Sequence, residues 1–152
     1  EPKSMLRLKA AASKLSDFTS GTFQPVIGDS TISNAQRVIM CSGKIYWELL
    51  AEKAKLSDTS TAIIRIEQLY PLPVTELVAE ISKHSKAELL WVQDEPANQG
   101  PWPFLSANLA EHLGGRTLRR VSRRASASPA TGSIYVHEEE QKALIAEAFA
   151  RS

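Results

Sequence analysis

The chain has 152 residues, a formal net charge of +1, 43% hydrophobic residues and 23% charged residues. This length suits one domain with its own core, and the near-neutral charge favours neither a nucleic acid nor a membrane as partner. The single cysteine, Cys41, excludes an internal disulfide and a cysteine-rich zinc site, and its apolar neighbours predict a buried, inert thiol. No apolar run reaches the ~20 residues of a membrane span, so we expect a cytoplasmic protein.

The first 35 residues carry weak structural signals. The chain begins without Met and in mid-pattern, so we expect a piece of a larger protein. Residues 8–18 predict a short amphipathic helix. Residues 19–35 contain Gly21, Pro25, Gly28 and many Ser and Thr, a composition typical of a linker or an extended crossing segment. The domain organisation that we expect is therefore a linker over 8–35 and a folded domain over 36–152.

From Gln36 onward, short apolar runs alternate with helical spacing. Apolar, β-branched runs predict strands over 37–41, 61–66, 88–93, 117–121 and 133–136. Helical spacing predicts helices over 45–56, 74–84, 104–113 and 138–150. This alternation predicts a three-layer α/β/α domain around a mostly parallel five-stranded sheet. Ligands and partners of such sheets usually lie beyond the carboxyl ends of the strands, which selects loops 42–44, 67–73, 94–103 and 122–132.

The stretch VIMCSGKIYWELL contains half of a phosphate-binding motif. A P-loop needs G-x-x-x-x-G-K-[ST], but Val38 stands at the first glycine and Ile45 stands at the Ser/Thr position. ATP hydrolysis is therefore not supported. Two interpretations remain. Either the helix start attracts an anion with the help of Lys44, or Ser42 caps the helix, Gly43 makes the turn and Lys44 meets a partner carboxylate.

The stretch WVQDEPANQGPW places two carboxylates, Asp94 and Glu95, beside two amides, Asn98 and Gln99. Paired carboxylates can carry acid–base catalysis. The segment has no His, Cys or Ser nucleophile, and its prolines and tryptophans are typical of a rigid surface loop. We therefore expect an interface here rather than a catalytic centre.

Arginines gather before the stretch ASASPATG. Arg123 and Arg124 carry planar guanidinium groups that suit carboxylates or phosphates. No aromatic residue interleaves, so base stacking is not supported. Arg-Arg-Val-Ser and Arg-Arg-Ala-Ser resemble sites of basophilic kinases, with Ser122 and Ser126 as acceptors. The alternative is that these arginines face solvent or pair with carboxylates of a neighbouring subunit.

The three histidines, His84, His112 and His137, lie far apart and lack the spacing of metal ligands. They also assemble no Ser-His-Asp triad with any nearby motif. The residues taken alone therefore predict neither a metal site nor an active site.

Four motifs together match one family in order and in approximate spacing: RVIMCSGKIYWEL, AIIRIEQLYPLP, LLWVQDEPANQGPW and RRASASPATGSIYVHEEEQ. The chain resembles the C-terminal part of the thiamine diphosphate-dependent dehydrogenase component of the 2-oxoglutarate dehydrogenase complex. The sequences of these motifs are most similar to those of actinobacterial members, which fuse acyltransferase and dehydrogenase parts in one multifunctional enzyme. The opening PKSMLR resembles the tail of the family's pyrimidine-binding domain, which assigns residues 1–7 to that tail.

This resemblance implies a transketolase-like C-terminal domain of an enzyme of the tricarboxylic acid cycle. The enzyme decarboxylates 2-oxoglutarate on thiamine diphosphate with Mg²⁺ and passes the succinyl group to a lipoyl group of its acyltransferase part. The resemblance places the cofactor between two other domains across a homodimer, so no catalytic, cofactor or metal residue is expected in this segment. The domain would support dimerisation and the wall of the active centre. A stand-alone nucleotide-binding module, or the equivalent domain of a pyruvate dehydrogenase or transketolase, is the alternative.

The resemblance also implies allosteric activation by acetyl-CoA, bound partly on this domain. Gln68 matches the family's amide in the motif IEQL. Relatives are arginine-rich just after the second proline of this loop, and they carry Lys and Ser in the preceding linker. The residues of this chain at those positions are Val74, Thr75, Glu76, Thr22 and Pro25. The effector residues expected from the resemblance are Gln68, Thr75, Glu76 and Thr22, although Glu76 would repel a phosphate at the start of helix 74–84.

Overall fold

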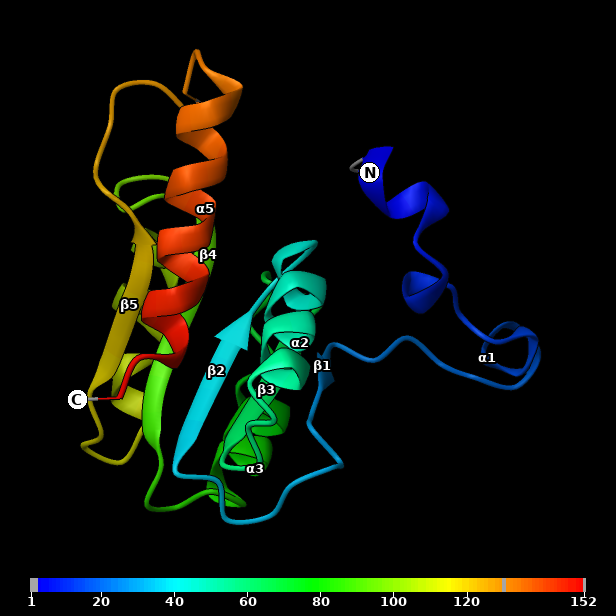
Figure 1. The fold of residues 1–152 in the computed structure, drawn as a ribbon. Coiled ribbons are helices and arrows are strands. Elements are labelled where there is room, and N and C mark those ends of the chain that lie inside the picture. Colours follow the sequence, from blue (N-terminus) through cyan, green and yellow to red (C-terminus); the bar gives the residue numbers. More distant parts are fainter. Residues whose placement is uncertain (1–2, 130, 152) are drawn as a thin grey trace.

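The computed structural model describes residues 3–129 and 131–151. Helices cover both faces of one five-stranded sheet, and the N-terminal segment extends away from these layers (Figure 1). The strands are β1 Val26–Ile27, β2 Arg37–Cys41, β3 Thr61–Ile66, β4 Glu88–Pro96 and β5 Leu118–Arg123. The α-helices are α1 Leu15–Thr19, α2 Ile45–Lys55, α3 Val74–Ser82, α4 Trp102–Asn108 and α5 Ile134–Phe149. Short 3-10 helices are η1 Lys3–Arg7, η2 Lys9–Ala11 and η3 Ala110–His112.

The strand order is β1-β3-β2-β4-β5, and the four longer strands pair in parallel. Strand β1 lies antiparallel to β3 at one border of the sheet, with Val26 opposite Ile66. All five residues of β2 are buried. A continuous apolar run of this kind is typical of a parallel strand that is covered on both faces. The expected α/β class with a mostly parallel five-stranded sheet is confirmed.

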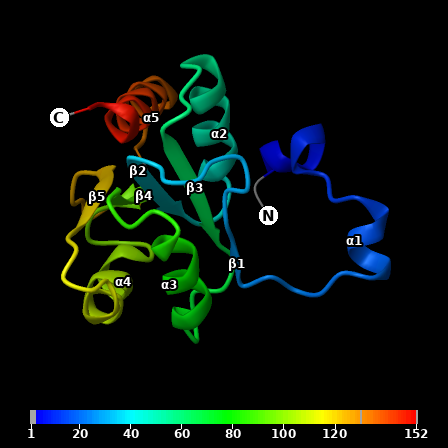
Figure 2. The same cartoon turned by 90° about the horizontal axis from the view of Figure 1, so that it is seen from below.

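The strands divide their side chains between two cores because successive residues point to opposite faces. Met40, Ile64 and Trp91 belong to the core that α3 and α4 cover. Ile39 and Leu90 belong to the core that α2 and α5 cover. Seen from below, these two helix pairs lie on opposite sides of the sheet (Figure 2). The sheet therefore separates two apolar clusters in a three-layer domain.

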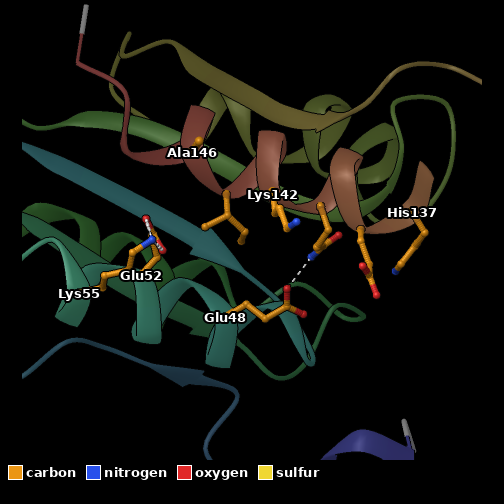
Figure 3. A pocket seen from close by; sticks show the side chains of 9 residues that line it. Glu48, Glu52, Lys55, His137, Lys142 and Ala146 are labelled. Carbon is orange, nitrogen blue, oxygen red and sulfur yellow. Dashed lines mark hydrogen bonds and ion pairs between the residues drawn. The ribbon is translucent and has the colours of Figure 1, made fainter. Parts of the chain in front are cut away.

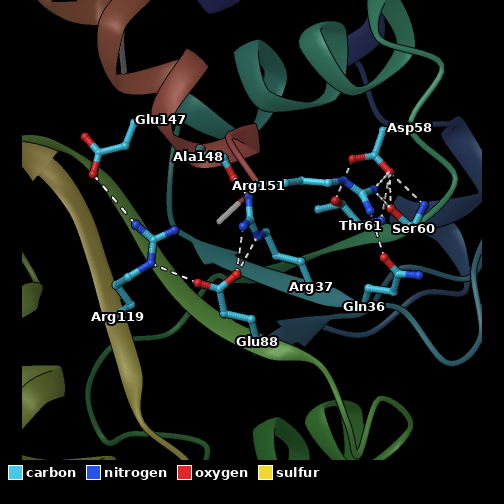
Figure 4. Close-up of polar contacts among 10 residues, drawn as sticks. All are labelled: Gln36, Arg37, Asp58, Ser60, Thr61, Glu88, Arg119, Glu147, Ala148 and Arg151. Atoms are coloured by element: carbon cyan, nitrogen blue, oxygen red, sulfur yellow. Dashed lines mark hydrogen bonds and ion pairs between the residues drawn. The ribbon is translucent and has the colours of Figure 1, made fainter.

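A charged network holds the amino ends of the parallel strands (Figure 4). Arg37 is 9% exposed; it donates to Glu88 from two nitrogens, at 2.7 and 2.9 Å, and to the carbonyl of Ala148 at 2.9 Å. Arg119 donates to the second oxygen of Glu88 at 2.9 Å. Burial raises the pKa of Glu88, but the two arginines outweigh burial and leave that pKa below its usual value. The network ties β2, β4 and β5 to the end of α5.

The fifth strand is not the one that the sequence predicts. Ser133 is the N-cap of α5 and residues 134–136 form its first turn, while the fifth strand is β1, which lies inside the predicted linker. Asp29 fixes this segment, because it accepts hydrogen bonds from Lys53 at 2.7 Å and from the Ile63 amide at 3.2 Å. Among the described residues, no strand pairs with the stretch that holds Ile134 and Val136, so helix formation prevails there.

The predicted helix over 8–18 is also wrong. That stretch divides into η2 and the start of α1, and the large apolar side chains there, such as Leu15 and Phe18, are 80% and 77% exposed. A helix this short gains its stability from packing, and no residue of α1 is buried. Residues 3–7 of the predicted domain tail form η1, while residues 1–2, like 130 and 152, lie outside the described residues.

The remaining elements match the prediction with shifted ends. Strand β4 continues past residue 93 to Pro96, and β5 runs from Leu118 to Arg123. Helix α4 begins two residues before 104, and a 3-10 turn replaces its expected end. These shifts lengthen two strands at the edge where the candidate site lies.

Candidate functional site

The predicted loops 42–44 and 67–73 follow β2 and β3, whereas the predicted loops 94–103 and 122–132 include the last residues of β4 and β5 and the connections after them. Because these strands are parallel, the loops gather at one edge of the sheet, together with the first turns of α2 and α5 (Figure 1). We call this the carboxyl edge. Each candidate residue of the sequence is placed below relative to this edge.

Lys44 is paired with carboxylates of its own chain. Its Nζ lies 2.8 Å from Asp94 and 3.5 Å from Glu48. Burial lowers the pKa of Lys44, but the hydrogen bond and charge of Asp94 outweigh burial and raise that pKa above its usual value. Gly43 makes the expected turn with a φ of 75°. The expected cap by Ser42 is wrong, because Lys44 itself occupies the N-cap position and the helix has no side-chain cap.

Gln141, a residue of α5, connects these charged groups to the last strand. It donates to Asp94 at 2.7 Å and to Glu48 at 2.9 Å, and its oxygen accepts from Arg123 at 3.1 Å. Arg123 also lies 2.8 Å from Nδ1 of His137. Since arginine only donates, this nitrogen of His137 is the acceptor of the contact. The result is one continuous polar network from α2 through β4 to β5 and α5.

Asn98 and Gln99 hold the loop that follows β5. Asn98 accepts the Ser126 amide at 3.0 Å and donates to the Ser126 carbonyl at 3.0 Å. Gln99 donates to the same carbonyl at 2.9 Å. All three residues lie at the surface, so these bonds position a loop rather than fill a core. Both amides thus bind within the chain, and the interface expected for this segment stays a prediction.

The two arginines of loop 122–132 have different environments. The Arg123 side chain is only 9% exposed and lies in the polar network, whereas Arg124 is exposed. Ser122 is half-buried within β5, and Ser126 is exposed. Glu95 is exposed beside the turn at Gly100, where φ is +66° and an added Cβ would lie 2.9 Å from the Glu95 side chain. Glycine therefore allows the close approach of this loop to Glu95.

The residues expected to bind the effector do not form one cluster. Gln68 donates to the carbonyl of Pro71 at 2.8 Å and thus stabilises its own loop. Thr75 and Glu76 are exposed in the first turn of α3, and Thr22 lies in the exposed segment before β1. The backbone amide of Gln68 donates to the Pro25 carbonyl at 3.2 Å, so the segment before β1 lies beside loop 67–73.

Apolar side chains are exposed at two places on the carboxyl edge. Tyr70 is 81% exposed and lies edge-on to Phe104, with ring centroids 6.2 Å apart, in a shallow hollow of about 390 Å³. Ile134, Tyr135 and Val136 are 72%, 79% and 48% exposed in the first turn of α5. Grouped apolar exposure of this kind marks interaction surfaces.

A groove of about 570 Å³ separates α2 from α5 (Figure 3). Glu48 and Glu52 line one wall, and His137 and Lys142 line the other. The lysines of the groove are paired within their own helices, Lys55 with Glu52 at 3.2 Å and Lys142 with Glu139 at 3.1 Å. The groove thus combines neutralised charges and offers no nucleophile with an adjacent base.

A metal site and a cysteine nucleophile each have requirements that can be compared with the described residues. Within 3–129 and 131–151, no three His, Cys, Asp or Glu side chains gather as a metal ion would require. Cys41 is buried, and burial raises the pKa of its thiol far above the usual value, so it is a poor nucleophile. No helix in this part of the chain is long and apolar enough to cross a bilayer.

Sequence reasoning located the carboxyl edge but missed the polar groups of α5. His137, Glu140 and Gln141 stand at helical spacing, so they share one face of α5. That spacing was readable from the sequence. The misplaced strand over 133–136 concealed it, because it put His137 outside the helix.

Comparison with known proteins identifies the family. Residues 12–149 match the family described as 2-oxoglutarate dehydrogenase C-terminal. The chain is 47% identical over 155 aligned residues to the "2-oxoglutarate dehydrogenase E1 component" of Cupriavidus necator, with 99% of this chain and 16% of the relative covered. It is 49% identical to the "2-oxoglutarate dehydrogenase E1/E2 component" of Corynebacterium glutamicum, with 97% and 13% covered.

A "Multifunctional 2-oxoglutarate metabolism enzyme" of Mycolicibacterium vanbaalenii is 46% identical, with 97% of this chain and 13% of the relative covered. The chain thus spans only 13 to 16% of the length of these relatives. The matched residues include every strand and helix that forms the carboxyl edge. The chain therefore belongs to the 2-oxoglutarate dehydrogenase C-terminal family.

Proposed function

We propose that this chain serves as the C-terminal domain of a thiamine diphosphate-dependent 2-oxoglutarate dehydrogenase. The whole enzyme decarboxylates 2-oxoglutarate, with Mg²⁺ and thiamine diphosphate, and passes the succinyl group to a lipoyl group in the cytoplasm. The printed names of the relatives, which include a fused E1/E2 protein, support this proposal. In it, residues 1–7 end the preceding pyrimidine-binding domain, 8–35 connect the two and 36–152 form the C-terminal domain.

The domain's own role is to dock its carboxyl edge against the rest of a homodimeric enzyme. The observation that carries this proposal is the apolar exposure at that edge: Tyr70 on one side and Ile134, Tyr135 and Val136 on the other. Between them the polar network from Lys44 to His137 gives the edge a fixed shape. A rigid, partly apolar surface suits the wall of an active centre that other domains complete.

The residues described do not fit the cofactor itself. Mg²⁺ prefers oxygen ligands in octahedral geometry. Asp94, a half-buried carboxylate at this edge, is already bonded to Lys44 and Gln141. The proposal therefore assigns this chain no step of the decarboxylation.

Regulation by acetyl-CoA is a further part of the proposal. The contact between Pro25 and Gln68 brings the segment that holds Thr22 to the loop before α3. The first turn of α3 presents free amides that attract anions, but Glu76 lies there too. We expect weaker activation than in relatives with arginines at positions 74–76, and Glu76→Arg should strengthen it. A full-length enzyme that acetyl-CoA activates equally with and without this substitution would contradict the assignment of the site to α3.

Two measurements test the central proposal. The isolated chain should neither bind thiamine diphosphate by calorimetry nor release CO₂ from 2-oxoglutarate. The longer enzyme that contains it should decarboxylate 2-oxoglutarate in preference to pyruvate. Turnover by the isolated chain, or a preference for pyruvate in the longer enzyme, would overturn the proposal.

A further inference from the structure

A second cavity at the carboxyl edge has a polar composition that the docking role does not explain. It measures about 290 Å³ and lies between the end of β5, the loop after it and α5. Arg123, Arg124, Ser126, Thr131 and Glu140 are among the residues that line it. Two guanidinium groups against one carboxylate leave the lining with a net positive charge.

Two buried polar atoms in this lining have no hydrogen-bond partner among the described residues: Nε of Arg123 and Oε2 of Glu140. They lie 3.5 Å apart as an ion pair without a hydrogen bond. Nη2 of Arg123 binds Nδ1 of His137 and Oε1 of Gln141, and these two contacts hold the side chain in place. Buried polar groups are almost always hydrogen-bonded, so a donor and an acceptor left open side by side indicate a missing partner.

The backbone brings this donor to the cavity. The pairing of β4 with β5 shifts register between Val92 and Pro96, so that Pro96 lies opposite Arg123. The Ala97 amide then donates to the Arg123 carbonyl at 3.0 Å. Irregularities of this kind bend a strand and redirect a side chain, and they recur beside functional sites.

We propose that this cavity binds hydrogen phosphate, an oxyanion that still carries a proton. Its oxygens accept from Nε of Arg123 and from the exposed guanidinium of Arg124. Its hydroxyl donates to Oε2 of Glu140, which as a carboxylate can only accept. One ligand then satisfies both open atoms, and charge-assisted hydrogen bonds of this kind are the strong ones.

Glu140 makes the site selective between anions. Sulfate has no proton to donate at neutral pH, so its oxygens would face the Glu140 carboxylate with no hydrogen bond between them. A phosphate monoester has lost most of its second proton at pH 7, because that pKa is about 6. The site should therefore rank inorganic phosphate above a monoester such as glycerol phosphate, and both above sulfate. A bridging water alone would satisfy the two atoms without any such ranking.

The experiment titrates the full chain with sodium phosphate, glycerol phosphate and sodium sulfate by calorimetry at pH 7 and constant ionic strength. One charge-assisted hydrogen bond corresponds to phosphate binding at least about tenfold more tightly than sulfate. Glu140→Gln supplies an amide that can donate to either anion, so the preference should fall to about twofold or less. Glu139→Gln, the matched control one residue away, should keep it.

Arg124→Ala should weaken phosphate binding about tenfold. Arg7 is also exposed but is distant in sequence from the cavity, so Arg7→Ala should leave phosphate binding unchanged. Circular dichroism of each variant confirms that the fold is intact. Saturable phosphate binding with the expected ranking supports the site. No saturable binding by the wild-type chain, or equal affinities for phosphate and sulfate that Glu140→Gln does not change, would overturn it.

Discussion

The two edges of the sheet use similar residues in different ways. At the amino edge, Arg37 and Arg119 converge on Glu88 and bind elements that lie 31 to 111 residues apart (Figure 4). At the carboxyl edge, Lys44 pairs with Asp94 and Arg123 bonds to Gln141, but Tyr70 and Tyr135 are about 80% exposed around them. A charged network at one end of a domain can thus hold its elements together, while a similar network at the other end lies among apolar side chains that remain exposed.

The largest expected effect concerns the amino edge. Arg37→Ala removes the buried half of the pair with Glu88 and the bond to the Ala148 carbonyl. We expect the free energy of unfolding to fall by about 3 kcal/mol, because a partly buried carboxylate loses its main partner. Urea denaturation measures this change, with the exposed Arg7→Ala as control. A loss as small as that of the control would show that the network does not hold this edge.

Acid should weaken the amino edge next. The pKa values of Glu88 and Asp58 lie below their usual values: burial raises each, but Arg37 and Arg119 outweigh it for Glu88, as do Thr61 and Ser60 for Asp58. A lowered pKa contributes stability above the unfolded-state value and loses it as the pH falls through the folded-state value. Stability should therefore decline below about pH 4.

Urea midpoints between pH 7 and pH 3 measure this decline. Glu88→Gln should flatten it, because the group that binds the proton is gone. The exposed Glu76→Gln serves as control and should keep the wild-type slope. If the urea midpoint of Glu88→Gln still fell with pH as steeply as that of the wild type, protonation of Glu88 would not be a cause of the acid sensitivity.

A smaller effect is expected from the surface bonds of the carboxyl edge. The double variant Asn98→Ala with Gln99→Ala releases the Ser126 backbone. Global stability should change by less than about 1 kcal/mol, because these hydrogen bonds are exposed to water. Amide hydrogen exchange in residues 124–129 should nevertheless accelerate. Asn108→Ala, which breaks one bond within α4, is the matched control and should leave that loop protected.

The sequence predicted those parts of the fold whose signals are local. Strands β2 and β3 match the predicted residues, because both are apolar runs buried on two faces. Strand β1 has only two residues, and its place depends on Asp29 and on the register of Val26 with Ile66. Such long-range partners leave no pattern in a single sequence.

The candidate site was predicted to a similar extent. The loops were expected at the carboxyl edge, and Lys44, Asn98 and Gln99 do lie there. Their partners were not predictable, since Gln141 meets Asp94 across 47 residues. The half phosphate motif at Lys44 correctly indicated a turn, and the sequence did not show that Asp94 pairs with the lysine.

The smallest effect on stability is expected for Tyr135→Ser, which should nevertheless have a large effect on dimer formation. Tyr135→Ser removes an exposed ring, so the free energy of unfolding should stay within about 0.5 kcal/mol of the wild type. In the homodimeric enzyme that we propose, the same change should weaken the dimer, as measured by analytical ultracentrifugation. Leu56→Ser, at an exposed apolar residue where α2 ends, should leave the dimer intact. Equal dimer affinities for the two variants would contradict a special role of the carboxyl edge.

The most direct test compares hydrogen exchange of this chain alone and within the longer enzyme. Docking through the carboxyl edge predicts added protection in residues 67–73, 94–103 and 131–137. It predicts no change in residues 57–60 and 147–151, which lie at the amino edge. Added protection at the amino edge, with none at the carboxyl edge, would contradict the account.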